Sequence, residues 1–292
     1  MRYFLENSNN MVEIKSRGAE LTSFMHKNVE YIHQPSPLDW NRSAPFLFPN
    51  IGALKNKVTY IDDKEYTLPK HGFLRDLELT LIAKTNNSLM FMAKDSPETL
   101  AVYPYHFNMT ITYTLAGDEL SCSIELINPS TTPLYFNFGL HPAFRVPLFN
   151  NERFEDYLIE FQNPVTCSIP TVDLSNGLVD YEKVSRTFKK VKTLPLNYAD
   201  YQNDALIIDK FKDHHISLYN PSTNKGIDFT FKPFKTLGIW TPNHVKANFI
   251  CLEPWNGCAD NYNSRNFIDK KDIIELEGKG VWTASFKISI RD

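Results

Sequence analysis

Strict alternation of apolar and polar residues recurs along this chain from one end to the other. In residues 107–115 (FNMTITYTL) the odd positions are apolar, and in residues 120–126 (LSCSIEL) the even positions are apolar. Residues 227–231 and 286–290 repeat the pattern. Because successive side chains of a β-strand point to opposite faces of its sheet, this period predicts strands with one face on a core and the other in solvent.

Turn signals separate these strands, and helix signals are scarce. The segment 116–119 (AGDE) has the length and the glycine of a hairpin turn. The one clear helix signal is Ser96 followed by Pro97, an N-cap residue and a proline at the first helical position. Shorter strands are expected at 12–16, 79–83, 89–93, 158–161, 205–208, 216–219, 237–240 and 248–252. Many short strands and few helices predict an all-β sandwich or barrel.

The composition supports this fold class. Aromatic residues make up 13% of the 292 residues, and there are 18 prolines. Aromatic residues favour strands, and prolines favour the turns between them. Since no Gly/Ser-rich linker or block of charge divides the chain, we expect a single domain over residues 1–292. The polar stretches 33–43, 148–157 and 173–200 are expected to be insertions or surface loops.

The charged residues nearly balance, with 31 Lys and Arg against 34 Asp and Glu. Such a balance gives no basic footprint for nucleic acid or for an anionic membrane. No stretch approaches the ~18 apolar residues of a membrane helix, and the N-terminus lacks a signal-peptide core. We therefore expect a cytoplasmic chain whose partners are small molecules. Free thiols are expected at the four cysteines, Cys122, Cys167, Cys251 and Cys258.

His141 follows a strand-like run, residues 133–140, and precedes Pro142. Because proline lacks the amide hydrogen that a strand ladder uses, the imidazole is expected at a strand end rather than in mid-sheet. A histidine there can donate a proton near neutral pH. The alternative is a structural histidine bonded to a backbone carbonyl of the loop.

Glu253 closes the apolar strand 249–252 and is followed by Pro254 and Trp255. A carboxylate at the end of an apolar strand is partly desolvated, which raises its pKa towards the range of a useful base. The indole of Trp255 can form a wall for a sugar ring. The alternative for Glu253 is a structural ion pair with an arginine or lysine.

His71 and Arg75 flank a compact turn and offer an imidazole and a five-donor guanidinium. Such a pair suits the hydroxyls of a polyol or a phosphate, although Arg75 can instead form an ion pair with Asp76 or Glu78. Asp204 precedes the apolar run 205–208 and can accept hydrogen bonds from hydroxyls or cap a turn. Asp209, which ends the same strand, is the competing choice.

Several motifs are absent from the chain. There is no GxSxG, P-loop, GxGxxG or HExxH sequence, so nucleophilic hydrolysis, nucleotide binding and zinc proteolysis have no support. His214 and His215 are neighbours on an expected strand and therefore point to opposite faces, which argues against joint ligation of a metal. The sequence predicts neither a metal nor an organic cofactor.

Three motifs together resemble one known family. They are KHGFLRD at 70–76, GLHPAF at 139–144 and CLEPWNG at 251–257. In order and spacing they resemble the aldose 1-epimerase (galactose mutarotase-like) superfamily, and most closely its LacX-type branch. The resemblance covers the whole chain. It implies a large antiparallel β-sandwich with an open sugar-binding cleft.

The resemblance also implies roles for individual residues. His141 corresponds to the general acid of the family and Glu253 to its general base. His71 and Asp204 correspond to substrate-binding residues, and Arg75 matches the HGFxR form of the LacX-like and hexose-6-phosphate branches.

One motif of the galactose mutarotase branch differs here. Where that branch carries Asn-Arg, this chain reads FPNIG at 48–52. Asn50 is therefore the candidate substrate-binding residue of this stretch, and Arg42 and Arg75 are candidates to replace the missing arginine. Trp255 completes the expected sugar site.

The function that these residues imply is that of an isomerase, an aldose 1-epimerase or mutarotase. It would interconvert the α and β anomers of a hexose by acid–base ring opening and reclosure. Two alternatives stay open: a hexose-6-phosphate mutarotase, and a non-catalytic carbohydrate-binding or regulatory protein on the same fold. The expected partner is a sugar or sugar phosphate, and the expected state is a monomer or homodimer.

Overall fold

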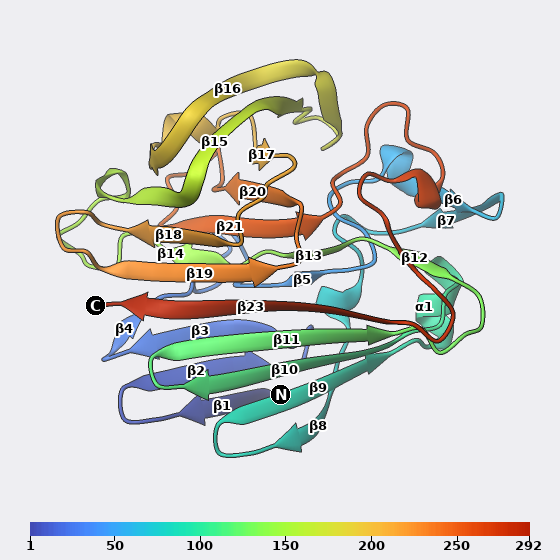
Figure 1. Ribbon diagram of the computed structural model, residues 1–292, viewed down its shortest axis with the longest axis horizontal. Coiled ribbons are helices and arrows are strands. Elements are labelled where there is room, and N and C mark those ends of the chain that lie inside the picture. Colours follow the sequence, from blue (N-terminus) through green and yellow to red (C-terminus); the bar gives the residue numbers. More distant parts are fainter.

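Two antiparallel sheets enclose the main core of the computed structural model, which describes residues 1–292 (Figure 1). Across the larger sheet, the nine strands are β16 (Val179–Pro195), β15 (Leu158–Val172), β18 (His215–Tyr219), β19 (Gly226–Lys232), β23 (Val281–Arg291), β11 (Glu119–Ile127), β10 (Asn108–Ala116), β9 (Ser88–Lys94) and β8 (Thr80–Lys84). Across the six-stranded sheet the order is β17 (Leu206–Ile208), β20 (Thr236–Trp240), β21 (Phe249–Asn256), β13 (Phe138–Leu140) and β5 (Phe46–Leu47), with β14 (Ala143–Arg145) also paired to β21.

Smaller elements surround these two sheets. The remaining strands are β1 (Arg2–Glu6), β2 (Asn10–Lys15), β3 (Glu20–His26) and β4 (Val29–Glu30) in one sheet, the hairpin of β6 (Val58–Ile61) and β7 (Lys64–Thr67), and the pair of β12 (Leu134–Phe136) and β22 (Ile274–Leu276). Short 3₁₀ turns occur at Lys55–Lys57, Leu74–Asp76, Phe154–Asp156, Tyr198–Tyr201 and Phe267–Asp269. The one α-helix, α1 (Pro97–Val102), has six residues, and no helix combines the length and apolar character that crossing a membrane requires.

The alternation read from the sequence determines the pairing of β10 and β11. In β10 the odd side chains are buried, and the even ones are half-buried except for the exposed Ala116. β10 pairs antiparallel with β11 in the predicted hairpin. The helix signal is also confirmed, because Ser96 caps α1 and its Oγ accepts a hydrogen bond from the backbone N–H of Thr99 at 3.3 Å. The all-β sandwich is confirmed.

Aromatic side chains from the two sheets meet in the main core. The Phe144 and Phe229 rings lie 5.4 Å apart, and those of Phe138 and Trp282 lie 5.1 Å apart. Since β14 and β13 belong to the smaller sheet and β19 and β23 to the larger one, these contacts hold the sheets face to face.

The six-stranded sheet is buried on both faces. Along β21, Ile250 and Leu252 point into the main core. Their neighbours Cys251 and Glu253 therefore lie on the opposite face, which we call the cleft face. Both kinds of position are buried, so β21 has a buried side chain at every residue. The cleft face carries the polar and aromatic side chains that the sequence motifs single out.

The expectation of a loop at 173–200 is wrong, because β16 spans Val179–Pro195. With β15 it forms a long hairpin, here called the arm, which arches along one edge of the larger sheet (Figure 1). Most side chains of β16 are exposed, and several register shifts interrupt its pairing with β15. A strand that is exposed to solvent on both faces shows no alternation of apolar and polar residues. The alternation that predicts the other strands therefore does not predict β16.

Candidate active site

His141 lies at a break between two short strands that share one partner. β13 pairs with β21 through Gly139 and Trp255, and β14 pairs with β21 through Ala143 and Cys251. Between these pairs, the Pro142 carbonyl accepts a hydrogen bond from the backbone N–H of Leu252. The imidazole of the residue before Pro142 therefore lies opposite Glu253, at a strand end as the sequence predicts.

His141 and Glu253 contact each other directly. The Nε2 atom of His141 lies 3.0 Å from Oε2 of Glu253, and both side chains are buried. Neither this Oε2 nor Nδ1 of His141 has a hydrogen-bond partner within the chain. The contact of Glu253 is thus with an imidazole rather than with the arginine or lysine of a structural ion pair.

Burial controls the proton content of this pair. It lowers the pKa of His141 to about 3, with the charges of Lys70 and Arg75 acting in the same direction. It raises the pKa of Glu253 well above 4.5, and the Asp204 carboxylate adds to the rise. Because both shifts oppose charge, they favour a neutral imidazole beside a protonated Glu253.

His71 presents a fixed hydrogen-bond donor. Its Nδ1 accepts a hydrogen bond from the backbone N–H of Gly52 at 3.1 Å, so Nε2 carries the hydrogen. Burial lowers its pKa well below 6.5 and keeps the ring neutral. The ring stands edge-on to that of His141, with centroids 5.5 Å apart.

The turn that holds His71 depends on Gly72. Both residues have positive φ, 68° and 71°. A Cβ on Gly72 would lie 2.0 Å from the carbonyl oxygen of Phe48, so only glycine allows the two backbones to approach this closely. The HG pair of the motif therefore fixes the direction of the imidazole.

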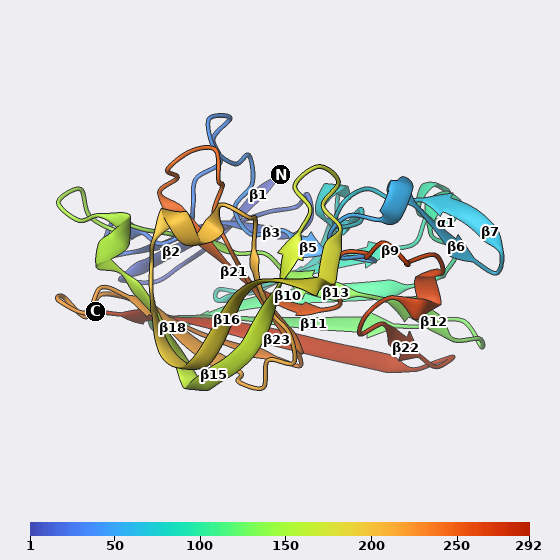
Figure 2. The same ribbon diagram turned by 90° about the horizontal axis from the view of Figure 1, so that it is seen from above.

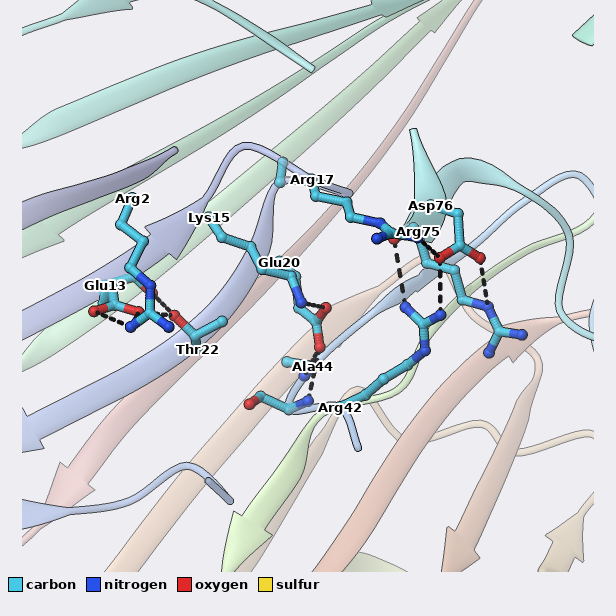
Figure 3. Close-up of polar contacts among 12 residues, drawn as sticks. Arg2, Glu13, Lys15, Arg17, Glu20, Thr22, Arg42, Ala44, Arg75 and Asp76 are labelled. Atoms are coloured by element: carbon cyan, nitrogen blue, oxygen red, sulfur yellow. Dashed lines mark hydrogen bonds and ion pairs between the residues drawn. The ribbon is translucent and has the colours of Figure 1, made fainter. Parts of the chain in front are cut away.

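Arg75 and Lys70 add positive charge to the same cavity. The Nη2 of Arg75 donates a hydrogen bond to the Lys70 carbonyl, whereas its Nε lies 3.8 Å from the Asp76 carboxylate. Arg17 and Arg42 contact that carboxylate more closely, at 2.8 and 2.9 Å (Figure 3). Burial and the Arg42 charge lower the pKa of Arg75 to about 10, so it stays charged at neutral pH.

Trp255 forms one wall of the cavity, because its neighbours on the adjacent strands are glycines. A Cβ on Gly139 in β13 or on Gly238 in β20 would lie 2.6 Å from an indole carbon. The indole thus lies flat over both strands. Any larger residue at these positions would push it into the cavity.

The structure separates the two competing aspartates. Asp204 lines the cavity in a left-handed conformation (φ 71°). Asp209 lies outside it and forms an ion pair with Lys271 at 2.9 Å. Asp204 therefore has the position expected of a substrate ligand.

Asn50 does not line the cavity, which corrects the expectation that it contacts substrate. Its side chain is fully buried, and its Nδ2 donates hydrogen bonds to the carbonyls of Gly52 and Pro69, each at 3.2 Å. Asn50 thus joins the turn at residues 50–52 to the segment that leads into His71. Its place is behind the site, where it supports the histidine. Arg42 likewise lies outside the cavity.

A cavity of about 340 Å³ connects these groups, within the ~300–1,000 Å³ typical of small-molecule sites. The residues predicted from the sequence that line it are His71, Arg75, His141, Asp204, Glu253 and Trp255. Further lining residues not predicted from the sequence are Asp39, Trp40, Lys70, Val172, Gly177, Val179, Trp240 and His244.

Three separate segments provide most of the residues that sequence reasoning missed. They are the loop at 34–42, the loop at 241–248 and the tip of the arm, all of which project from the same side of the molecule (Figure 2). In the first loop the Trp40 indole stacks on the His141 ring at 4.7 Å. The only sequence signal for it is an Asp-Trp pair in a proline-rich stretch, and the arm tip has none.

Comparison with known proteins identifies the family of the chain. The profile of the family described as Aldose 1-epimerase matches residues 1–289. Protein LacX of Lactococcus lactis subsp. lactis, in plasmid and chromosomal forms, is 34% identical over 278 residues, which cover 92% of each chain.

Two solved structures show the same fold. A galactose mutarotase related enzyme from Lactobacillus acidophilus has a TM-score of 0.93 at 28% identity, covering 100% of this chain and 98% of that one. A galactose mutarotase-like protein from Lactobacillus casei ATCC 334 has a TM-score of 0.89 at 27% identity, covering 100% of both chains. The chain belongs to the aldose 1-epimerase family and has a galactose mutarotase-like fold.

Proposed function

We propose that the protein is an aldose 1-epimerase that interconverts the α and β anomers of a hexose. The observation that carries the proposal is the buried contact of His141 with Glu253 at 3.0 Å, beside a cavity that a pyranose can enter. The hydroxyl at C1 and the ring oxygen O5 are bonded to the same carbon. An acid and a base that lie side by side therefore match the two oxygens that exchange protons.

The proposed reaction begins once the proton of the pair has moved from Glu253 to His141. Glu253 accepts the proton of the C1 hydroxyl while His141 donates its proton to O5, and the C1–O5 bond breaks. After rotation about the C1–C2 bond, Glu253 returns a proton to the carbonyl oxygen as O5 attacks C1, and His141 takes the proton from O5. The pair ends with the one proton it had at the start.

The surrounding side chains support this sequence of transfers. Each positioned acid or base typically contributes about 10²–10⁴-fold to the rate. The Nε2–H of His71 and the carboxylate of Asp204 offer a donor and an acceptor that can hold the sugar hydroxyls in place. Trp255 offers a flat apolar surface to the ring.

A second candidate activity is mutarotation of hexose 6-phosphates. Arg75 and Lys70 both line the cavity, and Arg75 remains charged at neutral pH. A charged guanidinium is a strong ligand for a phosphate oxygen. The two activities differ only in what the part of the cavity near Arg75 binds.

One measurement tests both candidates. NMR exchange spectroscopy should show anomer exchange of an aldose that rises in proportion to protein concentration, across a panel of free hexoses and their 6-phosphates. Faster exchange of the 6-phosphates would favour the second candidate. Saturable binding of a sugar without any enhanced exchange would reject both in favour of a non-catalytic binding protein.

A further inference from the structure

A third heteroatom lies beside the acid–base pair. Cys251 precedes Glu253 by two residues on β21, so both side chains lie on the cleft face. The Sγ of Cys251, a ring nitrogen of His141 and a carboxylate oxygen of Glu253 all lie within 4.8 Å of one another, and all three side chains are buried. Cys251 is a free thiol.

We propose that these three side chains bind a Zn²⁺ ion that inhibits the enzyme. A thiolate, an imidazole and a carboxylate form the donor set of a three-ligand zinc site with one open position. Mg²⁺ and Ca²⁺ prefer oxygen ligands and are excluded by the sulfur and nitrogen donors. This is a site for a competing ion, distinct from the cofactor-free reaction.

The distances suit a tetrahedral ion. Zinc bonds of about 2.0–2.3 Å place neighbouring donor atoms about 3.3–3.5 Å apart. The nitrogen and oxygen are 3.0 Å apart, and no pair of donors exceeds 4.8 Å.

One of the donors has an unused lone pair. The Oε2 of Glu253 is buried and accepts no hydrogen bond within the chain. A buried carboxylate oxygen without a donor is costly, and a bound cation satisfies it as fully as a proton does. The packing of Cys251 with Ala143 and Phe249 accounts for its burial but not for the two heteroatoms beside its sulfur.

The fourth position of the ion would face the cavity, since His141 and Glu253 both line it. Zinc therefore occupies the acid and the base at the same time and competes with the sugar. The inhibition rests on the proposed function, whereas binding of the ion does not. A direct measurement of metal binding therefore tests the zinc site independently of the catalytic activity.

The test is a titration of the purified, metal-free protein with Co²⁺, followed by displacement with Zn²⁺. Co²⁺ bound to a thiolate gives a sulfur-to-cobalt charge-transfer band in the near ultraviolet. We expect one equivalent of Co²⁺ to produce this band and Zn²⁺ to remove it. Micromolar Zn²⁺ should also suppress anomer exchange, and a chelator should restore it.

Cys251→Ser and Cys258→Ser form a matched pair of variants. Both thiols are buried, and Cys258 lines the same cavity without belonging to the three-residue cluster. Cys251→Ser should lose the charge-transfer band and weaken Zn²⁺ binding by at least about 100-fold, because loss of a direct ligand costs more than the ~10–100-fold of losing an outer-shell partner. Cys258→Ser should keep the charge-transfer band and the affinity for Zn²⁺. The inhibition by Zn²⁺ in each variant is measured relative to the rate of anomer exchange of the same variant after treatment with a chelator.

Three outcomes would overturn the site. They are the absence of a charge-transfer band, a band that persists in Cys251→Ser, and a band lost in Cys258→Ser alone. Should Cys251→Ser not fold, Glu253→Gln provides the second variant, in which the affinity for Zn²⁺ must fall. A protein that binds Co²⁺ through Cys251 but catalyses no anomer exchange would uphold the metal site and reject the proposed function.

Discussion

The indole of Trp40 stacks on the imidazole of His141, with centroids 4.7 Å apart and planes inclined by 24°. The Trp240 ring is nearly perpendicular to the same imidazole, with centroids 5.9 Å apart, so aromatic rings lie on two sides of the proposed acid. The Trp40 backbone is held in turn, because its carbonyl lies 3.0 Å from Nε2 of His33. The loop at 34–42 thereby fixes the orientation of a side chain that lies between β13 and β14.

We expect Trp40→Ala to lower kcat by about 10–100-fold, since small displacements of a catalytic group cost up to about 10²-fold. Trp40→Phe keeps an aromatic face on His141 and should retain most of the rate. Steady-state kinetics by polarimetry would measure both. Equal decreases of kcat in the two variants would show that the rate does not depend on the aromatic contact with His141.

We expect Glu253→Gln and His141→Asn each to lower kcat/KM by about 10²–10⁴-fold, because each removes one of the two proton-transfer groups. The double variant should be little worse than the singles, because the pair acts as a unit. Circular dichroism should show an intact fold. Wild-type rates in both single variants would contradict the assignment.

Arg75→Gln should distinguish the two candidate substrates. If the cavity takes a 6-phosphate, this variant should raise KM for the phosphorylated sugar by about 10-fold or more, because a charge-assisted bond is lost. The KM for the free sugar should change little. Arg17→Gln is the matched control, since Arg17 contacts the same Asp76 carboxylate but does not line the cavity.

Gly238→Ala should both destabilise the protein and weaken sugar binding. The new methyl group would overlap the Trp255 indole, which lies 2.6 Å from the Cβ position, and overpacking of this kind costs about 1–3 kcal/mol. Thermal unfolding and KM would report the two effects. In a Trp255→Phe background the same change should cost less; an equal cost would place the strain elsewhere.

Asp76 should make a small contribution to stability that depends on pH. Burial opposes its ionisation, but hydrogen bonds from Arg42 and Arg17 outweigh that effect and hold its pKa below 3.8. A carboxyl whose pKa is lower in the folded than in the unfolded state stabilises the fold above the unfolded value and loses this contribution as pH falls through the folded value. The contribution is modest, because the carboxylate is partly exposed.

The corresponding measurement is the difference in melting temperature between wild type and Asp76→Asn. The difference should be largest near neutral pH and should shrink as the pH is lowered below 3.8. Since other carboxyls titrate identically in both proteins, the comparison isolates this group. A difference that stays constant down to the lowest pH would contradict the ionic origin of the contribution.

Local signals were sufficient to predict the fold class and to single out several residues that line the cavity, whereas the roles of these residues are implied by the family resemblance. In β10 and β11 only one face is buried, and the residue types along each strand therefore alternate between apolar and polar. Pro142 marks the break that places His141 at a strand end. Glu253 lies where an apolar strand is followed by a proline and a tryptophan. The signals for His141 and for Glu253 are each contained within a few neighbouring residues.

The arm and the positions of Asn50 and Trp40 depend on contacts that cannot be predicted from the local pattern of residue types. Most side chains of β16 in the arm are exposed, and the strand is held largely by backbone pairing with β15, so its sequence resembles that of a loop. Asn50 stands among motif residues like a ligand of substrate, but its amide is satisfied by the carbonyls of Gly52 and Pro69 behind the cavity. Trp40 reaches His141 only because its loop folds back over the cleft face.

The arm adds a separate element to the cavity. Its tip brings Val172 and Val179 onto the cleft face, where they pack with Leu47 and Trp255, although the arm itself starts from the far edge of the other sheet. Insertions or exchanges in the turn at 173–178 can therefore reshape the entrance while the proton-transfer groups stay in place. A change confined to this hairpin tip can therefore alter which ligands enter the cavity while His141 and Glu253 keep their positions.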